Sequence, residues 1–211
     1  MSSKSDNPQI AFWRGAFGSE YIERNSATEA RVRALIPLWS RILAHTISSP
    51  PRSILEVGPN IGLNLRALRF LSEAKIYAVE PNDRAREILV RDGVIEPAHL
   101  RSGAALSIDF PNGVADFAFT SGVLIHIHPD DLLASCREIY RCSERWIACI
   151  EYFSDTPEHV HYRGHNEMLF KRDFGGFWLD NFPDLRAVSY GFIWKRATGL
   201  DNCNWWLFQK P

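Results

Sequence analysis

The fold of this chain is decided by the stretch Ser53-Ile54-Leu55-Glu56-Val57-Gly58-Pro59-Asn60-Ile61-Gly62. Its first five residues are mostly apolar, which predicts a short strand buried on both faces of a sheet. Gly58 then allows a turn in a backbone conformation that most residues avoid, and Gly62 leaves room for a close approach to the next helix. That helix should carry Leu63, Leu65, Leu68 and Leu71 towards the sheet. Because free N–H groups at a helix N-terminus favour negative charge, we expect a ligand at this turn.

A second strand is predicted over Lys75–Glu80, followed by a helix that Asn82 caps. Glu80 closes this strand about 20 residues beyond the glycine turn, where a carboxylate accepts hydrogen bonds from a ribose diol. Two successive strand-to-helix turns therefore indicate a nucleoside-containing ligand at the carboxyl edge of a parallel sheet.

The turn from Glu56 to Gly62 reads Glu-x-Gly-x-Asn-x-Gly, not Gly-x-Gly-x-x-Gly. It resembles the first motif of class I S-adenosylmethionine-dependent methyltransferases, with Asn60 where a middle glycine is usual. Val79–Asn82 resembles their second motif and Ala115–His126 their fourth. One such motif alone would indicate only an ordinary α/β unit, but three in the expected order favour this family. The resemblance implies a Rossmann-like α/β fold: a seven-stranded, mostly parallel sheet with helices on both faces and a C-terminal antiparallel hairpin.

Length and charge limit the alternatives. The 211 residues fit one methyltransferase domain over 26–211, preceded by an N-terminal segment over 1–25. The net charge of −1 gives no long-range attraction to nucleic acid or to an anionic membrane. No apolar run is long enough to span a bilayer and no signal peptide is evident, so we expect a cytoplasmic protein. We interpret Cys136, Cys142, Cys149 and Cys203 as reduced thiols, not as disulfides or zinc ligands.

The segment from Phe12 to Asn25 is dense in aromatic residues but interrupted by glycines, which predicts an irregular conformation. It either packs on the domain or forms a lid over the cofactor. A lid would suit the implied cofactor, because aromatic faces such as those of Trp13 and Tyr21 attract a sulfonium cation and Arg24 could meet its carboxylate.

Further elements follow from local patterns. A capping box at Ser26–Glu29 begins a helix that Pro37 should kink, and Pro129 begins another. The remaining expected elements are strands over Leu100–Leu106, Ala115–Ser121, Trp146–Tyr152, Leu185–Lys195 and Asn204–Gln209, and a helical region over Asn166–Asn181 interrupted at Gly175–Gly176.

The family resemblance implies a cofactor site made of the strand ends and the lid. An acidic residue that often binds the adenine amino group is absent near Gly103, so the backbone near Ala104 would serve. The complete expected set is Tyr21, Arg24, Glu56, Gly58, Asn60, Gly62, Glu80, Asn82, Ala104, Ser121 and Gly122, with S-adenosyl-L-methionine as the cofactor.

Three other stretches resemble a narrower bacterial family, the methylases associated with pseudaminic acid biosynthesis. They are Phe12–Tyr21, Glu151–Phe153, and Tyr162–His165 with Leu169–Phe174. This resemblance implies a sugar or a glycan-linked acceptor, such as a sugar nucleotide or a nonulosonic acid-related metabolite.

His126 and Glu151 are the candidates for a base, because each follows a strand that faces the crevice. A histidine after a strand is often structural, and Glu151 could instead bind an amine or fix a loop. We expect the acceptor to contact Trp13, Tyr152, His161, Tyr162 and Arg163. Arg163 suits a carboxylate or phosphate, or else forms a surface salt bridge.

Alternatives remain open at this point. No metal is expected, because neither His126-x-His128 nor His159-x-His161-x-x-x-His165 has a carboxylate or cysteine partner at recognised spacing. No Asn/Asp-Pro-Pro-Tyr motif follows the fourth strand, which counts against methylation of nucleic-acid bases. The competing functions are an NAD-dependent oxidoreductase and a non-catalytic binding module with this fold. A homodimer through the aromatic C-terminal strands is also compatible with the sequence.

Overall fold

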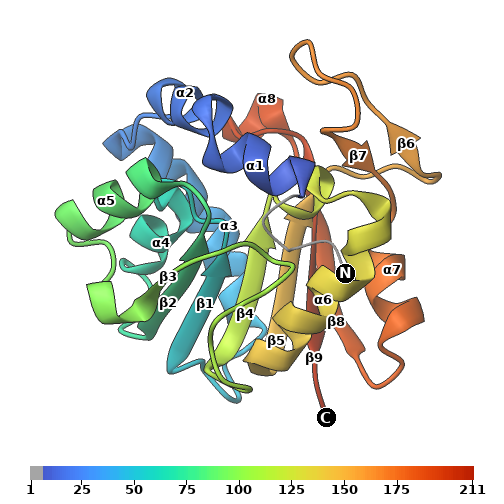
Figure 1. Cartoon of the computed structure of the whole chain (residues 1–211). Coiled ribbons are helices and arrows are strands. Elements are labelled where there is room, and N and C mark those ends of the chain that lie inside the picture. Colours follow the sequence, from blue (N-terminus) through green and yellow to red (C-terminus); the bar gives the residue numbers. More distant parts are fainter. Residues whose placement is uncertain (1–6) are drawn as a thin grey trace.

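A computed structural model describes residues 7–211, so the first six residues of the expected N-terminal segment 1–25 lie outside the described residues. Within this range the main sheet has seven strands in the order β3-β2-β1-β4-β5-β9-β8 (Figure 1). The strands are β1 (Ser53–Val57), β2 (Lys75–Glu80), β3 (Leu100–Ser102), β4 (Ala115–Ser121), β5 (Ser143–Glu151), β8 (Arg186–Ile193) and β9 (Cys203–Gln209). β1 to β5 pair in parallel, whereas β9 runs antiparallel to both β5 and β8. The predicted fold class is confirmed.

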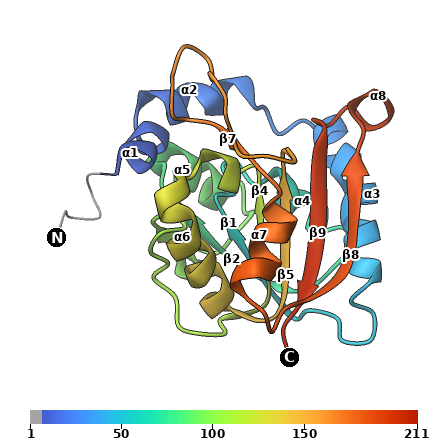
Figure 2. The same ribbon diagram turned by 90° about the vertical axis from the view of Figure 1, so that its right-hand side faces the viewer.

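Helices cover both faces of the sheet, as Figure 2 shows. They are α1 (Pro8–Arg14), α2 (Ala16–Arg24), α3 (Glu29–Ala44), α4 (Leu63–Leu68), α5 (Asp83–Arg91), α6 (Pro129–Cys142), α7 (Phe174–Asn181) and α8 (Lys195–Thr198), with short 3-10 turns η2 (Pro97–His99) and η3 (Leu124–His126). α3, α4 and α5 bury their apolar side chains on one face, around Trp39 and Phe119. α6 and α7 cover the other face, around Trp178 and Phe208. No helix in residues 7–211 is both long and apolar enough to cross a membrane.

The sheet reverses its strand order beside β1, which lies between β2 and β4. Val57 at the end of β1 is level with Val79 on one side and with Thr120 on the other. The carboxyl ends of the three strands therefore meet at one edge. In open α/β sheets this edge, next to such a reversal, is where ligands bind.

The N-terminal segment differs from the expectation of an irregular conformation. It forms two helices, α1 and α2, that meet at Gly15. Asn7 caps α1 by accepting a hydrogen bond from the N–H of Ile10, and Gly15 closes the helix on the carbonyl of Ala11. The glycine thus separates two regular helices instead of preventing them. Both helices cross above the carboxyl ends of the strands (Figure 1).

Other boundaries are corrected in the same way. Thr28, not Ser26, caps α3, and this helix continues through Pro37. The third strand ends at Ser102, and Leu71 lies beyond the end of α4. The helical region predicted from Asn166 is wrong up to Asp173, because this stretch contains β7 (Phe170–Lys171), which pairs with β6 (Glu158–His159). Gly175–Gly176 lie in the first turn of α7 and do not interrupt it.

Candidate functional site

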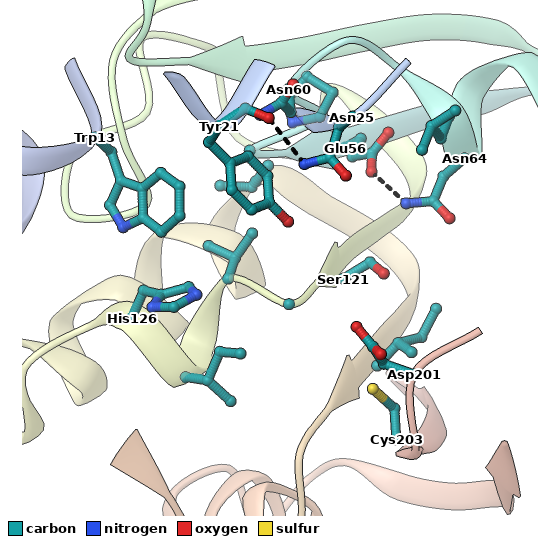
Figure 3. A pocket seen from close by; sticks show the side chains of 18 of the residues that line it. Trp13, Tyr21, Asn25, Glu56, Asn60, Asn64, Ser121, His126, Asp201 and Cys203 are labelled. Atoms are coloured by element: carbon teal, nitrogen blue, oxygen red, sulfur yellow. Dashed lines mark hydrogen bonds between the residues drawn. The ribbon is translucent and has the colours of Figure 1, made fainter. Parts of the chain in front are cut away.

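A cavity of about 900 Å³ opens at the carboxyl edge of β1, β2 and β4, beneath α1 and α2. In Figure 3, Trp13 and His126 lie on one side of it, and Asp201 and Cys203 face them from the other. Glu56 and Asn64 lie deeper, beside the turn that follows β1. The cavity is large enough for a nucleotide-sized ligand together with a small second molecule.

The turn after β1 has the backbone geometry that its sequence predicts. Gly58 has φ 74° and Asn60 has φ 51°, both in the left-handed region. Asparagine is one of the few residues with a side chain that tolerate this region, which explains why Asn60 can replace a glycine. The N–H of Asn60 then points at β2 and donates a 2.8 Å hydrogen bond to Oε2 of Glu80.

Glu80 connects the two turns at the edge of the cavity. Its Oε1 accepts a 2.9 Å hydrogen bond from the N–H of Asn82, while Oε2 binds Asn60. Only 5% of the residue is exposed, and burial raises the pKa of Glu80 to about 7. Because each carboxylate oxygen has two lone pairs, both oxygens can still accept a hydrogen bond from a ligand in the cavity.

Glu56 is a second buried acid in the cavity wall. Its Oε1 accepts a 2.8 Å hydrogen bond from Nδ2 of Asn64, but Oε2 has no hydrogen-bond partner among the described residues. Burial raises the pKa of Glu56 to about 8, and the nearby Glu80 adds to this effect. An unpartnered buried oxygen is costly, so this position favours a ligand that donates a hydrogen bond or carries positive charge.

Gly62 does not line the cavity. It precedes α4 with φ 78°, and a Cβ at this position would lie 2.7 Å from Leu89 and 2.9 Å from Val94. The prediction that another group lies close to the Gly62 backbone is therefore confirmed. The groups are the side chains of Leu89 on α5 and of Val94 in the turn after it. Gly62 thus has a role in packing, and its expected role in cofactor binding stays a prediction.

Asn82 is also outside the cavity wall and acts as a tether. Its Oδ1 caps α5 at the N–H of Ala85, as predicted, while Nδ2 donates to the carbonyl of Trp13 at 3.1 Å. Asn82 therefore joins the second strand-to-helix turn to α1. Its expected contact with a cofactor is replaced by this structural role.

The turn after β4 holds Ser121 and Gly122 at the cavity wall, and Glu151 lies beneath it. The Glu151 carboxylate accepts hydrogen bonds from the hydroxyl of Thr120 and from the N–H groups of Val123, Leu124 and Ile125. Glu151 is fully buried and does not line the cavity, and burial raises its pKa to about 7. The expectation that Glu151 faces an acceptor is corrected: its carboxylate fixes the turn that carries the cavity residues.

His126 lines the cavity at the end of this turn. Its ring packs against Trp13, with centroids 4.7 Å apart, and against Tyr162 at 5.2 Å. Nδ1 lies 2.6 Å from the carbonyl oxygen of Met168. Burial lowers the pKa of His126 to about 4, so the imidazole is neutral at physiological pH.

The two N-terminal helices bring Trp13, Tyr21 and Arg24 to the cavity, as predicted for a lid. Arg24 stacks over the rings of Phe17 and Tyr21 at 5.3 and 5.8 Å. Ala104 also lines the wall, beyond β3. These residues surround the same space as Glu80 and Gly58, although they come from distant parts of the chain.

The predicted acceptor residues divide into two groups. Tyr152, Tyr162 and Arg163 line the cavity together with Trp13. His161 does not: it is exposed, and its Nδ1 lies 2.9 Å from Oδ1 of Asn166. Its expected contact with an acceptor is therefore corrected to a contact within the β6–β7 hairpin.

Sequence reasoning missed several polar residues of the cavity wall. Asp201 lies in the turn before β9, where Oδ1 accepts from Nζ of Lys195 at 3.0 Å and Oδ2 accepts from the hydroxyl of Tyr152 at 3.4 Å. Asn25, Arg31, Asn64 and Cys203 also line the wall. Asn64 offered a signal, as a polar residue in the first turn of an otherwise leucine-rich helix. Asp201 offered none, because its place depends on the C-terminal hairpin folding back to the cavity.

The histidines do not form a metal centre in the described part of the chain. No group of three or more His, Cys, Asp or Glu side chains from residues 7–211 is placed to hold a metal ion. His128 and His159 instead lie near the carboxylate of Glu167.

Comparison with known proteins agrees with this geometry. Residues 55–145 match the family model described as the methyltransferase domain, and this match spans β1 to β5. A comparison with curated proteins found no match. The fold of the whole chain is that of the class I S-adenosylmethionine-dependent methyltransferases.

Three solved structures illustrate the likeness. The 1,6-didemethyltoxoflavin-N1-methyltransferase of Burkholderia thailandensis has a TM-score of 0.69 and 18% identity, over 95% of this chain and 88% of that one. The magnesium protoporphyrin IX methyltransferase of Synechocystis PCC 6803 has a TM-score of 0.67 and 10% identity, over 96% and 98%. Both were crystallised with S-adenosylhomocysteine. The [4+2]-cyclase SpnF, with a TM-score of 0.59 and 12% identity over 85% and 82%, has the same fold and a different reaction.

Proposed function

We propose that this protein transfers a methyl group from S-adenosyl-L-methionine to a small polar acceptor. The observation that carries the proposal is the junction of Asn60 with Glu80, which joins the two turns at one edge of the cavity. The match to a methyltransferase domain and the structural neighbours crystallised with S-adenosylhomocysteine support the choice of cofactor.

The cavity residues fit this cofactor. The Glu80 carboxylate can accept hydrogen bonds from the two ribose hydroxyls, and the backbone beyond β3 at Ala104 lies on the side expected for adenine. The unpartnered Oε2 of Glu56 suits the ammonium of the methionine moiety, and Arg24 and Arg31 suit its carboxylate. When bound, the cofactor supplies an electrophilic methyl group on sulfur. The role of the chain is then to align the acceptor and exclude water.

The remaining space is rich in aromatic rings and hydrogen-bonding groups. Trp13, Tyr152 and Tyr162 offer flat faces, and Arg163 and Asp201 offer charges of opposite sign. Such a surface suits a sugar, a sugar nucleotide or a nonulosonic acid-related metabolite, in keeping with the resemblance to the pseudaminic acid-associated methylases. We place this reaction in the bacterial cytoplasm as part of the same proposal. A homodimer stays a prediction, favoured by the exposed side chains of Tyr190 and Phe192 on β8 and of Trp194 directly after it.

Ligand-induced stabilisation tests the cofactor. Under the proposal S-adenosylhomocysteine raises the melting temperature and NAD leaves it unchanged, since a ligand that binds only the folded state stabilises it by mass action. Stabilisation by NAD alone would favour the competing oxidoreductase and overturn the proposal.

Turnover is tested separately, with S-adenosylmethionine labelled in its methyl group and a panel of monosaccharides, uronic acids and sugar nucleotides. Label recovered in an acceptor supports the proposal. Binding of the cofactor without transfer to any acceptor would favour the non-catalytic module. The cyclase neighbour is one case in which this fold serves another reaction.

A further inference from the structure

His126 has a defined protonation state. Its Nδ1 lies 2.6 Å from the carbonyl oxygen of Met168, and a carbonyl oxygen only accepts hydrogen bonds. Nδ1 must therefore carry the ring hydrogen, which leaves Nε2 with a free lone pair. The residue lines the cavity, so the unprotonated nitrogen belongs to a ring at the site where an acceptor would lie.

The surroundings of this ring are aromatic. Trp13 from α1 and Tyr162 from the β6–β7 hairpin pack against it, and among the described residues its hydrogen-bond partner is the Met168 carbonyl. Burial is the main cause of its lowered pKa, and no charged side chain contributes to that shift. The imidazole is therefore held neutral, and one of its nitrogens is able to accept a proton.

Resting on the proposed function, we propose that Nε2 of His126 takes the proton from a hydroxyl group of the acceptor, and that the Met168 carbonyl is the positioning group that sets the tautomer. The acceptor oxygen forms a bond to the methyl carbon while the carbon–sulfur bond breaks, and that electron pair stays on sulfur. The hydroxyl proton passes to Nε2. A carboxylate acceptor would need no base, so the proposal commits to an alcohol, and transfer to nitrogen is one of the outcomes that would contradict it.

The tautomer depends on a segment far away in the sequence. Met168 belongs to the β6–β7 hairpin, which docks on the N-terminal helices through a 3.1 Å hydrogen bond from Nε2 of Gln9 to the carbonyl of Glu167. Phe12 packs against His165 and Phe17 packs against Tyr162 at the same junction. Figures 1 and 2 show this hairpin rising at the same end of the sheet as α1 and α2. The lid and the hairpin together therefore hold the base in its working form.

Nitrogen-15 NMR of the histidine side chains tests the tautomer without any acceptor. We expect the Nδ1–H form of His126 at neutral pH, with no protonation between about pH 6 and pH 8, where an ordinary histidine titrates. An Nε2–H tautomer, or titration near the ordinary histidine pKa, would overturn the proposal. The result holds whether or not the protein binds the cofactor.

Two substitutions separate proton transfer from a structural role. In His126→Asn the side-chain amide can still donate to the Met168 carbonyl, but no nitrogen can take a proton. In His126→Gln the amide reaches towards the position of Nε2 instead. We expect both variants to bind S-adenosylhomocysteine within about threefold of the parent, and to lose transfer by roughly 10²- to 10⁴-fold, the range of general-base catalysis. Transfer retained by His126→Asn would contradict the proposal.

The linkage in the product tests the acceptor class. Methyl esters release methanol in alkali, whereas methyl ethers and N-methyl groups resist it, so the carbon-13 chemical shift of the labelled methyl group is measured as well. A methyl ether supports an alcohol acceptor, and a methyl ester or an N-methyl group contradicts it. Failure of S-adenosylhomocysteine to bind would overturn the proposed function instead, while the NMR result would still report on the tautomer.

Discussion

The N–H of Asn60 donates a 2.8 Å hydrogen bond to Oε2 of Glu80 across the carboxyl edge of the sheet. This bond joins a left-handed turn after β1 to the last residue of β2, about 20 residues further along the chain. It orients the carboxylate before any ligand arrives, and preorganised groups bind with a smaller entropic penalty. The junction explains why the two motifs occur together in the sequence.

Replacing Glu80 with alanine should weaken binding of S-adenosylhomocysteine by a factor of ten or more, about 1.4 kcal/mol, because the ribose hydroxyls lose their acceptor. Isothermal titration calorimetry measures this directly. The control is Glu73→Ala. Glu73 is an exposed acid just before β2, and its replacement should leave the affinity unchanged. Equal affinities for both variants would show that the nucleoside binds elsewhere.

Replacing Glu56 with glutamine should stabilise the ligand-free protein and weaken its binding of the cofactor. Gln keeps the oxygen that accepts from Asn64 and puts an uncharged amide nitrogen in place of the other carboxylate oxygen, so no buried negative charge develops as the pH rises. The folded-state pKa of Glu56 is raised from 4.5 to about 8, so the native protein binds the proton more tightly than the unfolded chain does. The contribution of protonated Glu56 to the free energy of unfolding is fully present below the unfolded-state pKa of 4.5. It is lost as the pH rises towards about 8.

Chemical denaturation at several pH values checks this prediction. The advantage of Glu56→Gln over the parent should grow between pH 4.5 and about 8, and then level off. The gain reflects the unfavourable burial of the ionised carboxylate, and each unit of pKa shift corresponds to about 1.4 kcal/mol. A gain that is the same at every pH would contradict the assignment to this carboxyl group.

Gly62→Ala should be more destabilising than Gly93→Ala. Both glycines have positive φ, 78° and 65°, so the backbone strain is similar. A Cβ at Gly62 meets Leu89 and Val94 within 3 Å, whereas a Cβ at Gly93 meets nothing within 4 Å. We expect a loss of about 2–4 kcal/mol at Gly62 and about 1 kcal/mol at Gly93, measured by urea denaturation. Equal losses at the two positions would contradict the prediction, because they would show that the contact with Leu89 of α5 adds nothing to the cost of the Gly62 substitution.

Asn82→Asp should loosen the N-terminal helices without removing the cap of α5. The carboxylate still accepts from the N–H of Ala85, but it cannot donate to the carbonyl of Trp13. Hydrogen exchange should therefore become faster in α1 and α2 and stay unchanged in α5. Asn82→Ala is the matched variant, which should also release the cap at a cost of about 1 kcal/mol. Unchanged exchange in α1 would show that the tether is unimportant.

The sheet and the cofactor edge could be predicted because their signals are local. Gly58, Glu80 and Asn82 sit at fixed spacings within two strand-to-helix units, and the structure places each at the expected turn. At Gly62 the close approach is made by Leu89, a residue on another helix. Spacing along the chain reports that a close contact exists, but not which group makes it.

The N-terminal helices and the hairpin were harder to predict. The apolar run Met168-Leu169-Phe170 is too short to distinguish a strand from a helix. In the structure its last residue, Phe170, begins β7, which pairs with β6. Phe12 lies in α1 and Phe17 lies in α2. Both helices are regular despite the nearby glycines, because Gly15 falls between them. Asp201 reaches the cavity, and the Met168 carbonyl reaches the ring of His126, only through tertiary contacts that no local pattern encodes.

A crystal structure of the protein with S-adenosylhomocysteine would test the central claim most directly. The measured quantity is the distance between the Glu80 carboxylate oxygens and the ribose oxygens. We predict about 2.5–3.0 Å, a direct hydrogen bond, with the sulfur facing the side of the cavity that holds Trp13 and His126. An adenosine bound away from Glu80, or a cavity that stays empty at saturating ligand, would contradict the account.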